Sequence, residues 1–267
     1  MAKSKFTVQI VENREVAKDT FLFKMHLLGQ RIDPKPGQFL ELVCSPATLL
    51  NRPFSIHYFY DDKKHIKILF RNIGNGTDFL SKKAVGDYTE FYGPFGKGFS
   101  INKKDKNIAI IAGGIGYAPM VFLIKELLKQ KNLSNLDVFY GNKHKDDFVE
   151  FWRLNNNKLR FFLSTDNGSV GEKGFITDVF YKYLKKKEGS FDRIYTCGPV
   201  KMLKKISEIS SAFKIPAEGS FESRFGCGFG VCLGCSFKLK TGDCVKVCKD
   251  GPVFDLEKID WSQIIEE

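Results

Sequence analysis

The sequence predicts a multidomain protein in which an N-terminal antiparallel β-barrel precedes a central doubly wound parallel α/β sheet and a small C-terminal lobe. Three observations support this fold class. Short strand patterns between glycine and proline turns fill the first hundred residues, strands alternate with amphipathic helices in the next hundred, and five of the seven cysteines lie in the last 41 residues. The expected domains therefore span residues 1–101, 102–214 and 215–267.

The first domain shows the period of two that is typical of strands with one buried face. In FTVQIVE, Phe6, Val8 and Ile10 alternate with polar residues, and HIKILFRN repeats the pattern. PKPGQFLELVC and GDYTEFYGP place turn residues before residues with high β propensity. Several short strands separated by such turns favour a small antiparallel barrel.

The second domain begins where the pattern changes, after the polar segment SINKKDKN. IAIIAG predicts a short buried strand, and the helix after it would place Met120, Ile124 and Leu127 on one face. Further strands are expected at LDVFYG, LRFFLS and RIYTCGP, with a short polar helix after the first, a helix near FITDVFYKYLKK and a final helix after the last. This alternation is typical of a parallel, doubly wound sheet, and it fades into glycine and cysteine from about residue 215.

The composition is that of an ordinary globular protein, with 43% hydrophobic and 27% charged residues among 267. The formal net charge of +11 is compatible with a lysine-rich solvated surface, or with docking to an acidic partner or an anionic cofactor. We do not expect a nucleic-acid-binding protein, because the sequence contains no RNA-recognition, helix-turn-helix or finger motif.

The sequence predicts neither a secretory signal nor a membrane span. The N-terminal segment MAKSKFTVQIVENREV has no apolar stretch of the kind that a signal requires. Residues 107–124 are uncharged and long enough to span a membrane, but Gly113, Gly114, Gly116 and Pro119 interrupt them, which favours a strand, a turn and a helix. An odd number of cysteines without a signal argues against a secreted disulfide framework, so we expect a cytoplasmic protein.

The C-terminal cysteines predict a metal centre. Cys227, Cys232 and Cys235 follow the spacing C-x4-C-x2-C, which is that of plant-type [2Fe–2S] proteins, and Cys244 or Cys248 could supply the fourth ligand. The glycines among them let the backbone wrap closely and direct N–H groups at the sulfurs of a negatively charged cluster. A structural zinc site is the alternative, but zinc modules usually contain two separated cysteine pairs.

The segment NRPFSIHYF contains residue types that suit a flavin dinucleotide. Arg52 could contact a pyrophosphate with two hydrogen bonds, while Ser55 and nearby backbone could hydrogen-bond the flavin ring. These roles assign Arg52, Pro53, Phe54 and Ser55 to FAD. An arginine beside a proline could also be only the edge of a barrel.

GNGTDFL, further along the chain, predicts a short helix whose first turn offers Gly76 and Thr77 to a phosphate. Thr77 could instead be only an N-cap of that helix. Each of the two motifs is weak alone, but their order, followed by a nucleotide-type domain, favours FAD.

Two turns of the second domain predict a nucleotide site. IIAGGIGYAPM carries Gly113, Gly114 and Gly116 at a strand-to-helix turn, where glycines permit close approach of a dinucleotide. The second turn, in YTCGPVKML, contains Cys197, Gly198 and Pro199. Both turns would lie at the carboxyl ends of parallel strands and flank a crevice. The glycine turn could instead be an ordinary tight turn, and Cys197 could be only a small buried residue.

Asp166, in LSTDNGSVGEKGFIT, bears on the choice of nucleotide. Its carboxylate would repel a 2′-phosphate and could accept a hydrogen bond from a ribose hydroxyl, which favours NAD over NADP. Lys143 and Lys145 could favour the opposite choice, although solvated surface positions explain these two lysines as well.

The order of these motifs (RPFS, G-x-GT, AGGIG-x-AP, TCGP and C-x4-C-x2-C) resembles that of the ferredoxin-NADP⁺ reductase-like superfamily. The segments SFESRFGCGFGVCLGC, VKVCKDGPVFD and IDW are similar to those of dihydroorotate dehydrogenase B electron-transfer subunits, and the resemblance covers essentially the whole chain. It implies FAD in the barrel, NAD⁺ at the parallel domain and one [2Fe–2S] cluster with Cys248 as the fourth ligand. It also implies flavin contact through the backbone of Leu69, Phe70 and Arg71.

Two features depart from the family pattern. The linker from Cys235 to Cys248 is short, which leaves Cys244 as a competing fourth ligand. In FESRF, immediately before the first clustered cysteine, the second aromatic residue, Phe225, is unusual for the family.

These cofactors imply a function in electron transfer. NAD⁺ accepts a hydride, a [2Fe–2S] cluster passes single electrons, and a flavin between them can exchange one or two. We find no acid–base pair or nucleophile for an organic substrate, so we expect no catalytic residue beyond Ser55 near the flavin N5, and electrons from another protein. The resemblance implies that this partner is the FMN-containing catalytic subunit that oxidises dihydroorotate in de novo pyrimidine (UMP) biosynthesis, in a heterotetramer with two copies of each subunit.

Two alternatives remain open on the sequence alone. A related FAD and [2Fe–2S] subunit, of an NADH-dependent ferredoxin:NADP⁺ oxidoreductase or of a sulfide dehydrogenase, would carry most of the same motifs. A zinc-stabilised nucleotide-binding regulator without redox turnover would carry the same cysteines, and colourless protein with stoichiometric zinc would identify it.

Overall fold

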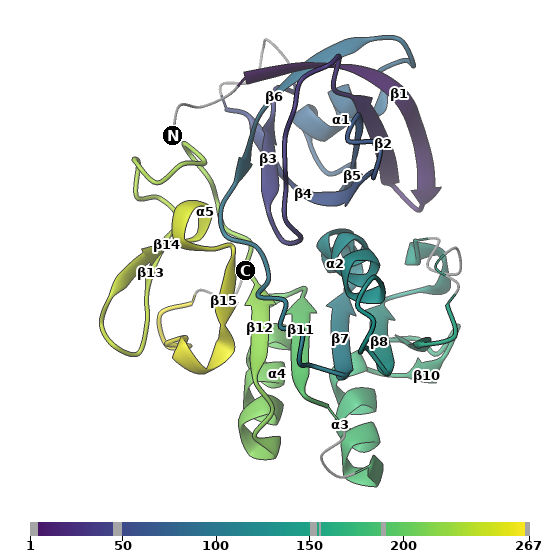
Figure 1. Cartoon of the computed structure of the whole chain (residues 1–267), viewed down its shortest axis with the longest axis vertical. Coiled ribbons are helices and arrows are strands. Elements are labelled where there is room, and N and C mark those ends of the chain that lie inside the picture. The colour runs from purple at the N-terminus through teal and green to yellow at the C-terminus, as the bar shows by residue number, and fades with distance from the viewer. Residues whose placement is uncertain (1–4, 45–49, 150–153, 155, 188–190, 265–267) are drawn as a thin grey trace.

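The computed structural model describes residues 5–44, 50–149, 154, 156–187 and 191–264, which form a barrel, an α/β layer and a small lobe beside them (Figure 1). The first elements along the chain are β1 (Lys5–Ala17), β2 (Thr20–His26), β3 (Phe39–Leu42), β4 (Arg52–Phe59), β5 (His65–Arg71), α1 (Asn75–Ser81) and β6 (Tyr88–Phe95).

These strands form a closed antiparallel barrel with the order β1-β2-β5-β4-β3-β6. Phe6, Val8 and Ile10 point into its core and are at most 8% exposed, as the period of two in β1 predicts. The pairing of β3 with β4 sets Phe39 opposite Ser55. The predicted antiparallel barrel is therefore confirmed.

The α/β layer is built on a seven-stranded sheet with the order β10-β9-β8-β7-β11-β12-β15. Its elements before the small lobe are β7 (Asn107–Gly113), η1 (Gly114–Tyr117), α2 (Ala118–Leu128), β8 (Asn135–Asn142), η2 (Lys145–Asp147), β9 (Leu159–Thr165), β10 (Glu172–Lys173), α3 (Ile176–Lys187), β11 (Arg193–Cys197) and α4 (Val200–Phe213).

Helices cover both faces of this sheet. The central strand β7 is apolar on both sides, as a strand covered on both faces must be. Ile108 and Ile110 belong to the same core as α2, whereas Ala109 and Ile111 belong to the core of α3 and α4. The paired strands from β10 to β12 are parallel. The predicted doubly wound parallel sheet is therefore confirmed.

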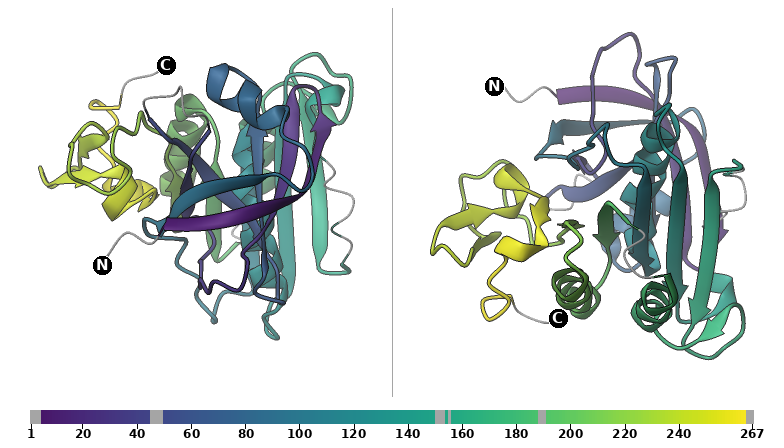
Figure 2. Two further views of the ribbon diagram at one scale, coloured as in Figure 1. Left: turned by 90° about the horizontal axis from the view of Figure 1, so that it is seen from above. Right: turned by 60° about the horizontal axis from the view of Figure 1, so that its bottom comes forward.

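The C-terminal lobe lies along one edge of the sheet (Figures 1 and 2). Cys227, Cys232 and Cys235 lie in the loop before its small hairpin, Cys244 lies on the hairpin and Cys248 in the short helix after it. An aromatic cluster packs this part together, with Phe221 5.8 Å from Trp261 and 5.9 Å from Phe254 between ring centroids. The elements of this region are β12 (Ala217–Ser220), β13 (Ser236–Lys238), β14 (Cys244–Lys246), α5 (Val247–Asp250), β15 (Val253–Asp255) and η4 (Leu256–Lys258).

Two findings refine what the sequence pattern predicts, and a third agrees with it. Strands β12 and β15 lie beyond residue 214 yet belong to the α/β sheet, so the fold continues across the domain boundary expected there. The short polar helix expected after LDVFYG is only the three-residue turn η2. The uncharged segment 107–124 forms β7, η1 and part of α2, as predicted, and within the described residues no helix has the length and apolar character needed to cross a membrane.

Candidate functional site

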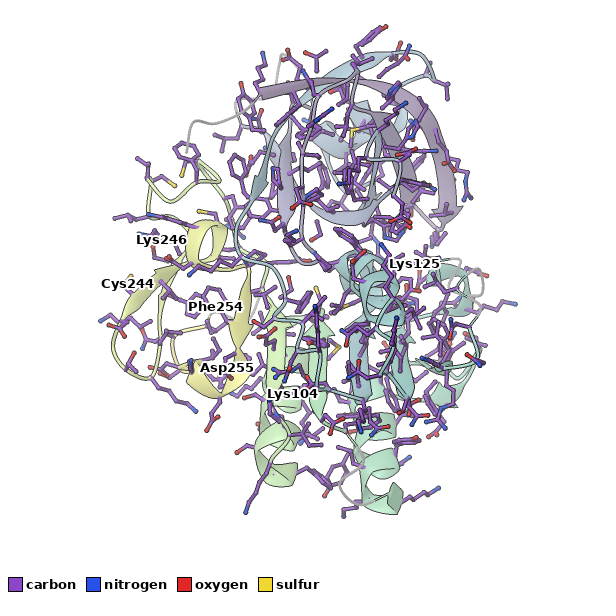
Figure 3. All side chains as sticks on the ribbon, in the orientation of Figure 1. Lys104, Lys125, Cys244, Lys246, Phe254 and Asp255 are labelled. Carbon is purple, nitrogen blue, oxygen red and sulfur yellow. The ribbon has the colours of Figure 1, made fainter. Side chains whose placement is uncertain are left out.

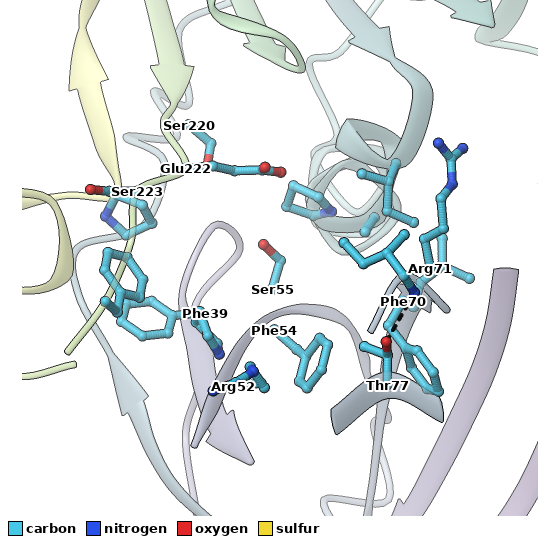
Figure 4. Close-up of a pocket in the computed structure, with 18 of the residues that line it drawn as sticks. Phe39, Arg52, Phe54, Ser55, Phe70, Arg71, Thr77, Ser220, Glu222 and Ser223 are labelled. Carbon is cyan, nitrogen blue, oxygen red and sulfur yellow. Dashed lines mark hydrogen bonds between the residues drawn. The ribbon is translucent and has the colours of Figure 1, made fainter. Parts of the chain in front are cut away.

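A cavity of about 350 Å³ opens where the barrel, the α/β layer and the C-terminal lobe meet (Figure 4). The barrel supplies most of its wall. The turn after β7 supplies Ile115, the start of α2 supplies Ala118 and Pro119, and the region after β12 supplies Glu222 and Phe225. All nine residues predicted to contact FAD line it: Arg52, Pro53, Phe54, Ser55, Leu69, Phe70, Arg71, Gly76 and Thr77.

The floor of the cavity is aromatic and its rim is polar. Phe54 and Phe70, from the adjacent strands β4 and β5, lie with ring centroids 5.6 Å apart. Ser55 projects from β4 into the same space (Figure 4). This combination suits a flat aromatic ligand whose edges carry hydrogen-bonding groups, which is what an isoalloxazine ring presents.

Arg52 and the first turn of α1 converge at one end of the cavity. Arg52 lines the cavity, and its Nη1 donates to the carbonyl of Leu50 at 2.8 Å, which restrains the guanidinium group. A Cβ atom at Gly76 would lie 3.4 Å from Cγ of Arg52, so glycine allows the turn to approach the arginine side chain closely. Both features suit a bound pyrophosphate.

Thr77 is already engaged within its own turn. Its hydroxyl accepts from the backbone N–H groups of Ile73 at 3.0 Å and Gly74 at 3.1 Å, and donates to the carbonyl of Gly74 at 2.9 Å. The hydroxyl therefore stabilises the start of α1 from the third helical position. Gly74 is the N-cap, so the alternative that Thr77 is the N-cap is wrong.

Glu222 and its neighbours are functional-site residues that the sequence reasoning assigned no role. Glu222 and Ser223 face Ser55 across the cavity, on the side of the C-terminal lobe (Figure 4). Glu222 keeps contact with solvent through the open cavity, but the surrounding protein desolvates it and raises the pKa of its carboxyl group. The segment SFESRF was visible as a motif, but nothing in its pattern placed the carboxylate opposite β4.

The two glycine-containing turns predicted for NAD lie against each other. A Cβ atom at Gly116 would overlap the carbonyl of Cys197 and would lie 2.7 Å from the nitrogen of Gly198. A Cβ atom at Gly113 would lie 3.1 Å from Cδ of Pro199. Because these residues end β7 and β11, which are paired in parallel, the contact lies at the carboxyl end of the sheet, as predicted.

Gly114, Cys197 and Asp166 take different places around these turns. Gly114 has a φ of +55°, a conformation that favours glycine. Cys197 lines the cavity but is 3% exposed, and burial raises the pKa of its thiol, so it is a packed rather than a reactive cysteine. Asp166 is exposed after β9, does not line the cavity, and is tied to β8 through its backbone N–H and the carbonyl of Asn142 at 3.2 Å.

The four predicted cysteine ligands form two adjacent pairs. The backbone N–H groups of Val231 and Cys232 donate to Sγ of Cys227 at 3.3 and 3.4 Å, and the sulfurs of Cys235 and Cys248 lie 3.3 Å apart. Within the residues that the structure describes, no three histidine, cysteine, aspartate or glutamate side chains converge in the way that holds a single ion.

Electrostatics distinguish the first cysteine from the last. Although burial acts in the opposite direction, backbone N–H groups of Cys232, Phe229 and Val231 lower the pKa of Cys227 to about 6. Burial, followed by the contact with Cys235, raises the pKa of Cys248 to about 12. N–H groups directed at a sulfur and two buried sulfurs in contact are the donor set that a thiolate-bound cluster uses, so these residues fit a [2Fe–2S] group.

Cys244, the competing fourth ligand, differs from Cys248 in its position and exposure. It is exposed on β14, where it pairs with Lys238 of the hairpin (Figure 3). Cys248, by contrast, is 1% exposed within α5 and touches Cys235. The contacts therefore favour Cys248 over Cys244 beside the other three cysteines.

Family models match three consecutive parts of the chain. An oxidoreductase FAD-binding domain matches residues 7–99, an oxidoreductase NAD-binding domain matches residues 110–208, and the iron–sulfur cluster binding domain of dihydroorotate dehydrogenase B matches residues 222–260. The predicted cofactors FAD, NAD and an iron–sulfur cluster are confirmed at this level.

Solved structures support the fold. A chain from a structure of an NADH-dependent reduced ferredoxin-NADP oxidoreductase is 26% identical, with a TM-score of 0.85, over 96% of this chain and 90% of that one. The ferredoxin reductase of carbazole 1,9a-dioxygenase shares the fold with a TM-score of 0.69 at 20% identity, over 81% of this chain and 68% of that chain.

Curated relatives match over nearly the whole chain. The dihydroorotate dehydrogenase B (NAD(+)) electron transfer subunit of Clostridium acetobutylicum is 37% identical, covering 94% of this chain and 96% of its own. The same subunit from Caldanaerobacter subterraneus subsp. tengcongensis is 35% identical, covering 96% and 98%. With these relatives, the cavity and the cysteine lobe in agreement, the chain belongs to the family of dihydroorotate dehydrogenase B (NAD(+)) electron transfer subunits.

Proposed function

We propose that this chain carries electrons from the FMN of a dihydroorotate-oxidising catalytic subunit to NAD⁺, as part of pyrimidine (UMP) biosynthesis. The observation that carries the proposal is that the FAD-binding, NAD-binding and cluster-binding parts all contribute side chains to one cavity. When bound, the cluster exchanges single electrons, FAD one or two, and NAD⁺ a hydride.

The barrel residues would bind and orient FAD. Arg52 would neutralise the pyrophosphate, with the backbone around Gly76 and Thr77 beside it. Ser55, with Pro53 and Phe54 on the same strand, would hold the flavin ring near its N5. On the neighbouring strand, the backbone of Leu69, Phe70 and Arg71 would contact the same ring. All of these groups line the cavity, which supports the assignment.

The turns of the α/β layer would place the nicotinamide against the flavin. Gly113, Gly114 and Gly116 would allow the dinucleotide to approach the backbone closely, and the facing turn, with Cys197, Gly198 and Pro199, would close the other side of the crevice. Asp166, further along the same edge of the sheet, would select NAD by repelling a 2′-phosphate.

The C-terminal lobe would hold the cluster through Cys227, Cys232, Cys235 and Cys248. The contact of Cys248 with Cys235 and the N–H groups directed at Cys227 support this set. We also propose that the functional division follows residues 1–101, 102–214 and 215–267, although strands from the last part complete the sheet.

A catalytic partner follows from the function, because the relatives are named electron transfer subunits. We propose that this partner contains FMN, that two copies of each chain form a heterotetramer, and that the complex is cytoplasmic.

The experiment that tests the proposal is anaerobic co-purification of the chain with its native partners, followed by cofactor analysis. We expect an FMN protein in equal amount, one FAD and two irons per chain, and dihydroorotate-dependent reduction of NAD⁺. A larger two-flavin partner would instead indicate a bifurcating oxidoreductase, and colourless protein with stoichiometric zinc would indicate a regulator. Either result would reject the proposal.

A further inference from the structure

One barrel strand, β3, contacts the cysteine loop at two points. The ring of Phe39 lies 5.0 Å from that of Phe225, which is the unusual aromatic residue before the first clustered cysteine. Both rings line the cavity. Strand β3 therefore lies where the flavin cavity meets the segment that leads into the cysteine loop.

Glu41, two residues further along β3, makes the second contact. A Cβ atom built on Gly228 would lie 2.7 Å from both Cγ and Cδ of Glu41 and would overlap its Oε1. Gly228 also has a φ of +72°. Gly228 directly follows Cys227. Because it has no side chain, the carboxylate of Glu41 can lie directly against the cysteine loop.

The carboxylate of Glu41 is an uncommon group for such a position. Glu41 is 4% exposed, and burying a carboxylate is costly unless the surroundings compensate for it. Its negative charge already influences a neighbour, because it contributes to the raised pKa of Cys44, after burial as the main cause. A charge in this place lies close enough to the loop to act on the group that the loop holds.

The opposite side of the loop carries a charge of the opposite sign. A Cβ atom on Gly230 would lie 2.8 Å from Cδ of Lys249, so the lysine side chain runs along the loop there. Lys249 is exposed, so solvent and salt weaken its field, whereas the field of the buried Glu41 is screened much less. Neutral variants of Glu41 and of Lys249 should therefore shift the reduction potential of the same site in opposite directions and by different amounts.

We propose that the negative charge of Glu41 lowers the reduction potential of the iron–sulfur cluster. The ligands of that cluster would be Cys227, Cys232, Cys235 and Cys248. The inference rests on the proposed function. A cluster with four thiolates is negatively charged and gains one further negative charge when it accepts one electron. A carboxylate held next to the loop in a medium of low dielectric opposes that gain, and so favours onward transfer of the electron toward the flavin cavity.

The test is an anaerobic redox titration of the full-length holoprotein, with the reduced cluster followed by electron paramagnetic resonance. In Glu41→Gln we expect the ratio of reduced to oxidised cluster at a fixed potential to rise about tenfold, the size expected for neighbouring charges in a protein interior. A tenfold change corresponds to a shift of about 59 mV toward positive potential for one electron.

Three variants make the result specific to charge. Glu41→Asp keeps the charge and should stay close to the parent potential, whereas Lys249→Gln should shift the potential in the negative direction and by a smaller amount that shrinks with added salt. Phe225→Leu changes the packing of the same loop without a change of charge and should leave the potential nearly unchanged. If Glu41→Gln does not retain its cluster, Glu41→Met is a second neutral side chain of similar length that suits a buried position.

An unchanged potential in a neutral Glu41 variant that retains its cluster would overturn the inference, as would an equal shift in Phe225→Leu. These outcomes are distinct from failure of the proposed function. If the parent protein held no cluster, or did not reduce NAD⁺ with its partner, the proposed function would fail before any variant was compared.

Discussion

At the residue scale, His57 joins the barrel to the α/β layer and makes that junction sensitive to acid. It is buried on β4, and its Nδ1 lies 2.8 Å from the carbonyl of Ala118, to which an Nδ1–H group donates. Burial lowers the pKa of His57 to about 4. Between this value and the ordinary pKa of about 6.5, the unfolded chain binds the proton and the folded chain does not, so stability falls as the pH falls through this window.

We therefore predict that His57→Asn reduces the acid sensitivity of folding. The asparagine amide can still donate to Ala118 but takes up no proton, whereas the histidine costs the parent protein at most about 3 kcal/mol at pH 4. Urea unfolding at pH 7 and pH 5 measures how much stability each protein loses on acidification. Carboxylate groups contribute equally to that loss in both proteins, so the difference between the two losses reports His57. Equal losses of stability in the two proteins would contradict the prediction.

Cys248 gives a second prediction at this scale, because spacing alone left two candidates for the fourth ligand. We expect Cys248→Ser to lose most of its iron, acid-labile sulfide and visible absorption, since the sulfur that touches Cys235 is removed. Cys244→Ser is the matched control and should keep all three, because Cys244 is exposed on the hairpin whereas Cys248 is buried against Cys235. The reverse pattern would assign the ligand to Cys244.

Single residues also show where sequence reasoning ends. The types and spacing of Arg52, Ser55 and the clustered cysteines indicated their chemistry, since ligand chemistry depends on residue type. Glu41 and Glu222 carry no such signal: each becomes notable only because the fold brings it to a segment distant in sequence. Thr77 was ambiguous for a related reason, as only the three hydrogen bonds in its turn show where its hydroxyl is engaged.

At the scale of elements, the contact between the turn after β7 and the turn after β11 forms the crevice. We predict that Gly116→Ala weakens NAD⁺ binding by at least tenfold and lowers the melting temperature, because the new methyl group would overlap the backbone of Cys197 and Gly198. Calorimetric titration with NAD⁺ and thermal unfolding measure the two effects.

The control is Gly174→Ala, because no atom lies within 4 Å of a Cβ at that position, although its φ of +116° will cost some stability. The two variants should therefore differ in NAD⁺ affinity even if both melt earlier than the parent protein. Equal affinities for NAD⁺ would show that the two turns can separate without consequence.

Elements were predictable in proportion to their length and periodicity. The long strand β1 begins with a clear period of two and the helix α4 shows a clear period of 3.6, and both form as expected. The strands β12 and β15 have four and three residues, too few to show a period, and their pairing depends on partners far along the chain. A sequence pattern cannot show that the tail returns to the sheet, because that is a property of the tertiary fold.

At the scale of the whole molecule, the strands β12 and β15 join the C-terminal lobe to the α/β sheet. Strand β12 is parallel to β11, and β15 is antiparallel to β12, so the edge of the sheet beside the NAD turns is built from the C-terminal part. Side chains of both parts share one apolar core, with Nε1 of Trp261 donating to Oγ of Ser207 at 3.1 Å. The α/β layer and the cysteine-containing part therefore share one sheet and one core.

We accordingly predict that a chain ending at residue 214 is not an independent FAD- and NAD-binding unit. Removal of β12 and β15 would leave the edge of β11 unpaired and expose apolar residues of α4, among them Leu203 and Ile206, which are at most 1% exposed in the full chain. Compared with a control chain shortened by only the last three residues, we expect greater binding of a hydrophobic dye, a lower melting temperature and loss of bound FAD during gel filtration. A truncated chain that retained FAD and melted as the control does would show instead that the first two parts fold without the lobe, and that the lobe contributes only its cluster.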